Sequence, residues 1–319
     1  MGFRRDRDWV WDFWFAQDED RGEVHLFHLW APRSLGDPER RHQNARIGHA
    51  VSTDLRTWTR MRDPLPEAPP GAADDRACWT GSVVRDPGGG WRMFYTGVSE
   101  AEDGLVQRVL CATSEDLHHW RRTQLTLEAD PRWYEPQDWR DPWVEWDAGS
   151  GLWRMYVCAT VAAPGPRDGR GVLGMLTSPD LESWEAGPPV VAPGEFRQME
   201  VPQVVPCGSR VAVLFCANDV DHSAERLARG VAAEYGTHVV YGDTPAGPFH
   251  LEGDAFLSGD NGPSLYAGRA LRHHGRWWFL AWRRLDDSGA FLGELSDPFP
   301  LDVVDDALVV DFGPQARRL

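Results

Sequence analysis

The chain has 319 residues and a formal net charge of −16 at pH 7. This acidic surplus argues against a nucleic acid or an anionic membrane as partner, because either would require a basic face. The sequence contains no lysine, which excludes Schiff-base chemistry and phosphate binding by a P-loop lysine. No segment approaches the ~18 apolar residues of a membrane span, and the first residues lack the apolar stretch of a signal peptide. We therefore expect a cytoplasmic protein.

A short signature, Ser-x-Asp-Leu-x-x-Trp, recurs along the chain. It occurs at residues 52–58, 114–120 and 178–184, with degenerate copies at 243–249 and 295–299. Its aromatic ends at Trp58, Trp120, Trp184 and Phe249 are separated by 62, 64 and 65 positions. A period of this kind indicates an array of similar units that stack to bury their apolar faces.

Each unit is predicted to contain four short strands, because runs rich in aromatic and β-branched residues alternate with Gly, Pro and Asp turns. We expect the first strands to open at Trp11, Trp79, Trp139, Glu200 and near Pro263. Aromatic second strands are expected at 25–30, 91–96, 153–158, 211–216 and 277–282, and third strands at 46–52, 109–113 and 172–177. The signature itself is expected to form the fourth strand.

Five such units predict an all-β protein, a single five-bladed β-propeller of four-stranded antiparallel blades over residues 1–319, with no C-terminal β-sandwich. A β-sandwich is the alternative architecture. It would not require the same strand order in every unit, so we favour the propeller.

Three acids occupy the first strands of different units. Asp12, Asp141 and Glu200 would converge, because the first strand of each propeller blade lines the central channel. Taken singly, each acid is better explained as a turn, ion-pair or surface residue. Their common phase in the repeat favours one shared site. A pair of carboxylates, one protonated and one ionised, is what the cleavage of a glycosidic bond requires, and nearby tryptophans would offer flat faces to a sugar ring.

Neither the cysteines nor the histidines form a metal or cofactor motif. The five cysteines lack CxxC spacing, and three lie in apolar runs where free cysteine behaves as a small buried hydrophobe. His25, His28, His42 and His49 lie in separate strands and loops, without the helical spacing of an HExxH motif. We interpret His25 and His49 as packed or hydrogen-bonded strand residues and expect neither a metal ion nor another cofactor.

Several motifs, in order, resemble the β-fructofuranosidase and levansucrase group of propeller glycoside hydrolases. Val10-Trp11-Asp12-Phe13-Trp14 resembles the nucleophile segment of levansucrase-type enzymes. Trp79-Thr80-Gly81-Ser82 is similar to their Trp-Ser-Gly-Ser stretch, and Arg140-Asp141-Pro142 to their Arg-Asp-Pro motif. Glu200 falls where their acid/base glutamate lies, and Asp260-Asn261-Gly262 with Tyr266 resembles their last-blade segment.

The resemblance implies a role for each acid. Asp12 would be the nucleophile, Glu200 the general acid and then base, and Asp141, held by Arg140, the stabiliser of the transition state. The expected ligand is a small carbohydrate or oligosaccharide. Substrate contacts are expected from Trp11, Trp14, Trp79, Ser82, Arg140 and Tyr266.

The sequence also departs from this group. The Asn-Asp-Pro-Asn-Gly segment of invertase types is absent, and Phe13 follows Asp12 instead. Leu29 and Val201 replace the glutamine and cysteine usual in invertase types. The leading expectation is a retaining glycosidase or transglycosidase that acts on β-fructofuranosides such as sucrose or a fructan. The alternatives are an inverting arabinanase- or xylosidase-like hydrolase, a sugar-binding propeller without turnover, and a propeller recruited to a biosynthetic step.

Overall fold

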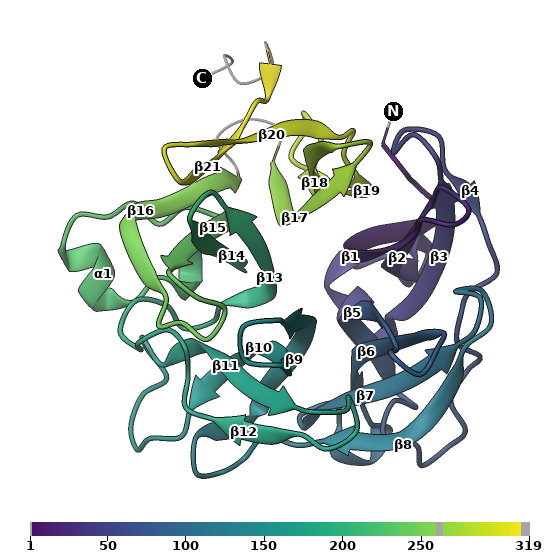
Figure 1. The fold of residues 1–319 in the computed structure, drawn as a ribbon, viewed down its shortest axis with the longest axis horizontal. Helices are drawn as coiled ribbons and strands as arrows, with labels where there is room; N and C mark the ends of the chain where they lie inside the picture. Colours follow the sequence, from purple (N-terminus) through teal and green to yellow (C-terminus); the bar gives the residue numbers. More distant parts are fainter. Residues whose placement is uncertain (1, 260–263, 314–319) are drawn as a thin grey trace.

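A computed structural model describes residues 2–259 and 264–313. Figure 1 shows five sheets arranged around a central axis, with β1, β5, β9, β13 and β17 innermost. The five-bladed β-propeller is therefore confirmed, and the described residues contain no additional β-sandwich. The expected strand start at Pro263 and the motif Asp260-Asn261-Gly262 lie outside the described residues.

The blades follow one another along the chain. Blade one contains β1 (Asp8–Asp18), β2 (Glu23–Pro32), β3 (Arg46–Ser52) and β4 (Thr59–Arg60). Blade two contains β5 (Ala77–Arg85), β6 (Trp91–Val98), β7 (Gln107–Ser114) and β8 (Arg121–Leu127). Blade three contains β9 (Tyr134–Asp147), β10 (Leu152–Val161), β11 (Gly171–Ser178) and β12 (Glu185–Gly187). Blade four contains β13 (Glu200–Cys207), β14 (Arg210–Ala217), β15 (Gly236–Gly242) and β16 (His250–Gly259).

The fifth blade departs from the four-strand pattern. It contains β17 (Leu265–His273), β18 (Arg276–Leu285), β19 (Phe291–Leu295), β20 (Phe299–Val304) and β21 (Ala307–Val310). β19 pairs with one part of β18 and β20 with another, so two strands share the third position. The break falls at residues 296–298, where Pro298 has no N–H to donate to a ladder.

Helical segments are short and lie between strands. They are α1 (Ala224–Ala228) and the 3-10 turns η1 (Arg33–Leu35), η2 (Pro38–Asn44), η3 (Glu100–Glu102) and η4 (Asp219–Asp221). Within the described part of the chain, no helix is long and apolar enough to cross a membrane.

The recurring signature forms a turn, and the expectation that it would be the fourth strand was wrong. The Ser52 hydroxyl accepts hydrogen bonds from the amides of Asp54 and Leu55, and the Asp54 carboxylate accepts from the next two amides. Leu55 adopts a left-handed conformation with φ of 61°. Side-chain bonds to nearby amides favour turns over strands. The fourth strand therefore begins only after the tryptophan.

The aromatic residue that ends each signature packs against the preceding blade. Trp120 of blade two meets Phe27 of blade one edge to face, with ring centroids 5.7 Å apart. Trp184 of blade three meets Phe94 of blade two at 5.5 Å. Trp58 stacks on Phe15 of its own blade, at 6.2 Å, and packs against a small cluster that includes Leu271 of the fifth blade. The sequence period thus marks one aromatic wedge for each interface between blades.

The two ends of the chain close the ring. The amide of Leu295 donates to the carbonyl of Phe3 over 2.8 Å, and the Arg33 guanidinium donates to the carbonyl of Leu292 over 2.6 Å. The amide side chain of Gln17 also donates to a carbonyl of the fifth blade, at Arg272. These hydrogen bonds hold blade five to blade one, and among the described residues no strand of blade one pairs with the fifth sheet.

Replacing Trp120 by alanine should lower the free energy of unfolding by about 3–5 kcal/mol, because a buried indole between two blades is removed. Chemical denaturation followed by circular dichroism measures the change. Trp133→Ala is the control, since Trp133 is 37% exposed, and it should cost less than about 1 kcal/mol. Equal losses in the two variants would contradict the wedge role.

Candidate active site

Every inner strand carries an irregularity at which its pairing register shifts. A bulge of this kind bends the strand and re-aims a side chain. The shifts place Asp12 in the bulge of β1 and Thr80 in that of β5. The corresponding shifts in β9, β13 and β17 fall at Asp141, just after Glu200 and just after Tyr266. The five blades therefore direct their irregular residues to one place on the axis.

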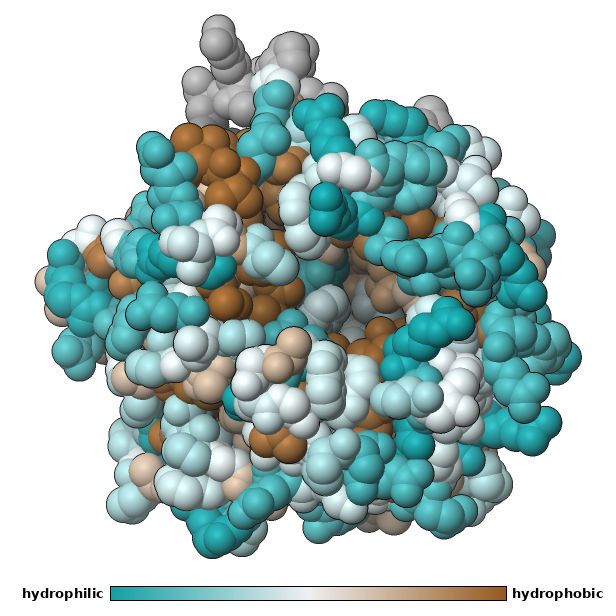
Figure 2. All heavy atoms as spheres, in the orientation of Figure 1, coloured by the Kyte–Doolittle hydropathy of each residue, from teal (hydrophilic) through white to brown (hydrophobic). Residues whose placement is uncertain are grey.

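A cavity of about 630 Å³ lies there and brings the three predicted acids together. Figure 2 shows one face of the ring, hollowed near its centre. Besides Asp12, Asp141 and Glu200, the lining includes four of the six predicted substrate-contact residues: Trp11, Trp79, Arg140 and Tyr266.

The structure does not place Trp14 and Ser82 among the residues that line this cavity. Trp14 lies beyond the bulge on β1, is fully buried and stacks on Phe27 in the core between blades. The Ser82 hydroxyl is buried and accepts a hydrogen bond from the amide of Val144 in blade three. Both residues hold neighbouring blades together.

Asp12 is held by donors from two other blades. One carboxylate oxygen accepts a hydrogen bond from the Thr80 hydroxyl over 2.9 Å, and the other accepts from the Trp282 indole over 3.0 Å. Burial and the charge of Glu200 raise the pKa of Asp12, whereas the Thr80 bond and two arginines oppose that rise. These donors leave the carboxylate fixed in orientation and facing the cavity.

Asp141 occupies a strained backbone position. Its φ is 60°, a left-handed conformation that costs a non-glycine residue energy and is found most often at functional sites. A carboxylate oxygen accepts the amide of Val201 over 3.1 Å, and Val201 itself has φ of 53°. Burial raises the pKa of Asp141 to about 7; Arg140 opposes the rise, and Glu200 and Asp12 add to it.

Glu200 receives one hydrogen bond on each carboxylate oxygen. Arg140 donates to Oε1 over 2.8 Å, and the Tyr266 hydroxyl donates to Oε2 over 2.5 Å. We expected Arg140 to hold Asp141, but its closest approach to Asp141 is 3.7 Å. The main carboxylate partners of Arg140 are therefore Glu200 and, at 3.0 Å, Asp138.

Several polar residues of the site were missed from the sequence. Gln107 and Gln198 accept hydrogen bonds from the Arg140 guanidinium and fix its plane. Arg269 donates to the carbonyls of Phe13, Val201 and Pro202, and burial lowers its pKa to about 10, so it remains a cation at neutral pH. Thr80 and Gln198 lie inside or beside motifs that the sequence did reveal. Trp282 and Arg269 carried no comparable signal.

A five-bladed propeller with three crowded carboxylates and aromatic walls at its axis has the architecture of the propeller glycoside hydrolases. The chain belongs to glycosyl hydrolase family 32: the model of that family's N-terminal domain matches residues 19–293. The match includes Asp141 and Glu200 but begins after Asp12. This start agrees with the absence of the invertase-type segment around Asp12.

Curated relatives carry fructosidase names. β-Fructofuranosidase insoluble isoenzyme 7 of Oryza sativa subsp. indica is 30% identical over 198 residues, which cover 59% of this chain and 30% of that protein. Fructan 6-exohydrolase of Triticum aestivum is 31% identical over 176 residues, 51% of this chain and 27% of the relative. The matched region is thus less than a third of each relative's length.

Solved structures share the fold over almost the whole chain. Inulosucrase from Halalkalicoccus jeotgali bound to kestose superposes with a TM-score of 0.78 at 22% identity, covering 97% of this chain and 89% of that one. The catalytic domain of Microbacterium saccharophilum K-1 β-fructofuranosidase gives 0.75 at 18% identity, covering 99% and 84%.

Asp141→Asn should change the pH dependence of stability. Asp141 titrates near 3.8 when exposed and near 7 in the fold, so between these values the folded protein keeps a proton that the unfolded chain has lost. Raising the pH through that range therefore destabilises the wild type. The variant should match it below about pH 4 and exceed it by up to about 4 kcal/mol at pH 8. Denaturation midpoints across pH measure this, and a difference independent of pH would contradict it.

Proposed function

We propose that this chain is a retaining fructosyl hydrolase or transferase that acts on β-fructofuranosides such as sucrose or a fructan. The observation that carries the proposal is the meeting of Asp12, Asp141 and Glu200 in one aromatic-walled cavity. Membership of family 32, the fructosidase names of the curated relatives and the kestose bound by the inulosucrase neighbour support a fructosyl substrate.

The first half of the proposed reaction forms a covalent intermediate. A carboxylate oxygen of Asp12 attacks the anomeric carbon, while Glu200 gives its proton to the departing glycosidic oxygen. Hydrogen bonds from Thr80 and Trp282 orient Asp12 for this attack. Asp141, positioned by the Val201 amide, faces the developing positive charge and sugar hydroxyls.

The second half releases the sugar. Glu200, now ionised, takes a proton from water or from a sugar hydroxyl, whose oxygen attacks the anomeric carbon and breaks the ester to Asp12. Arg140 and the Tyr266 hydroxyl each donate to one oxygen of the Glu200 carboxylate and hold it in place for this step. Water as acceptor gives hydrolysis, and a second sugar gives transfer.

Fructose release from sucrose, kestose and inulin tests the proposal directly. Asp12→Asn and Glu200→Gln should each lower kcat by at least about 10²-fold, because each removes a group that acts on the reacting bond. Asp20→Asn, a side chain 84% exposed, is the matched control and should retain wild-type activity. Arabinose release, or no release from any fructoside or arabinofuranoside, would overturn the fructosidase assignment.

The anomeric configuration of the first product distinguishes a retaining mechanism from an inverting one. With methanol as acceptor, a retaining enzyme transfers fructose to give the methyl β-fructofuranoside, which NMR identifies. An inverted product, the methyl α-fructofuranoside, would keep the site but replace covalent catalysis by direct attack of methanol on the anomeric carbon.

Tyr266→Phe tests the hydroxyl that holds Glu200. Loss of a hydrogen bond to a charged group is worth about 1.5–3 kcal/mol, so kcat/KM should fall roughly 10- to 100-fold. Tyr241→Phe is the control, since it removes a buried hydroxyl that bonds Leu308 in the fifth blade. An undiminished kcat/KM in Tyr266→Phe would show that the contact is dispensable.

A further inference from the structure

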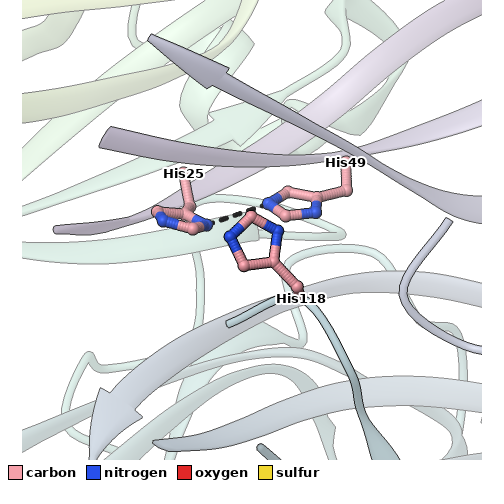
Figure 3. A group of neighbouring side chains, drawn as sticks. All are labelled: His25, His49 and His118. Carbon is pink, nitrogen blue, oxygen red and sulfur yellow. Dashed lines mark hydrogen bonds between the residues drawn. The ribbon is translucent and has the colours of Figure 1, made fainter. Parts of the chain in front are cut away.

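Three histidines from two blades meet outside the catalytic cavity. His25 lies on β2, His49 on β3, and His118 in the signature turn of blade two. Figure 3 shows the three rings turned toward one another. Their centroids are 5.1 to 5.3 Å apart, and one nitrogen from each ring lies within 4.8 Å of the others.

Each of the two buried rings has one nitrogen in a hydrogen bond and one without a partner. His25 Nδ1 and His49 Nε2 are 2.9 Å apart and share one hydrogen bond, as expected for packed strand histidines. The other nitrogen of each ring, His25 Nε2 and His49 Nδ1, is buried without a hydrogen-bond partner. In Figure 3 the nitrogens that share the hydrogen bond, and not these two, lie on the side of His118, so the space between that pair and His118 is the place for an ion.

Acidic side chains surround the three rings, and the imidazole nitrogen is a common zinc ligand. Asp18 and Asp116 add negative charge nearby, and the Glu23 carboxylate lies 3.9 Å from His25 Nε2, where a carboxylate partner of a ligating histidine is usual.

We propose that His25, His49 and His118 hold one zinc ion that ties the signature turn of blade two to blade one. Tetrahedral zinc with bonds of 2.0–2.1 Å separates its nitrogen ligands by roughly 3.3 Å. The His25–His49 pair has to open by a few tenths of an ångström, and His118 has to move inward. His118 can do so because it lies on a turn and is half-buried. The fourth zinc position faces this more open side and is left to water.

This proposal is independent of the proposed fructosyl chemistry. None of the three histidines lines the catalytic cavity, and their separation along the chain hid the cluster, so that we expected no metal from the sequence. The role of the ion is to stabilise the fold, because binding to the native state alone shifts the unfolding equilibrium.

Zinc and cobalt titrations of the whole chelator-treated protein test the site. Calorimetry should give one zinc per chain, and cobalt should give the visible absorption of a tetrahedral complex. At a zinc concentration about 100 times Kd, the thermal midpoint should rise by roughly 4 °C. His118→Ala should weaken zinc binding at least about 100-fold, since even the outer partners of metal ligands are worth 10- to 100-fold. If circular dichroism shows that His118→Ala folds poorly, His118→Asn takes its place in the titration.

His119→Ala is the matched control. His119 adjoins His118 in the same turn, but its side chain is 82% exposed and pairs with Asp116. It should bind zinc as the wild type does. The proposal is wrong if the wild type takes up less than one equivalent at 100 µM zinc, a concentration chosen as about 100 times a micromolar Kd. The proposal is equally wrong if His118→Ala binds zinc as the wild type does, or if His119→Ala abolishes zinc binding while His118→Ala does not.

Discussion

The structure depends on burying several carboxylates around one arginine. Asp12, Asp141 and Glu200 share a cavity in which the charge of Glu200 raises the pKa of both aspartates and Asp12 adds to the rise at Asp141. Arg140 lies among them and bonds both Glu200 and Asp138. Such a cluster is unfavourable in a low-dielectric site unless donors and cations surround it. The propeller provides them because the inner strands of its five blades converge on one axis.

The backbone of the inner strands supports this arrangement. A regular strand would place alternate side chains on opposite faces, whereas the bulges release one residue in each strand from that alternation. Asp141 and Val201 take left-handed conformations, and the Val201 amide is thereby available to Asp141. In blade two, Gly81 lets β5 lie close to the backbone of β6, since a Cβ at Gly81 would lie 2.1 Å from the Phe94 carbonyl oxygen.

The energy that maintains these strained positions comes from the interfaces between blades. The hydrophobic core is divided into clusters that join neighbouring sheets, and each signature turn contributes an aromatic side chain to one of them. The turn therefore recurs in successive blades because it serves packing. The acids of the site differ from blade to blade because they serve chemistry. The histidine cluster uses the same turn of blade two, in which the His118 ring contacts His25 and His49 of blade one.

The sequence alone determined the ring and the identity of its acids. A repeat of nearly constant length requires stacked units, and the common phase of Asp12, Asp141 and Glu200 requires that they meet. Hydrogen-bond partners were decided only by the tertiary structure, because Arg140–Glu200, Tyr266–Glu200 and Trp282–Asp12 join residues 60, 66 and 270 positions apart. Trp14 and Ser82 lie outside the cavity lining for a related reason: motif membership does not fix which way a side chain points beyond a bulge. Local pattern specifies the elements, and only their packing specifies which polar atoms come within bonding distance.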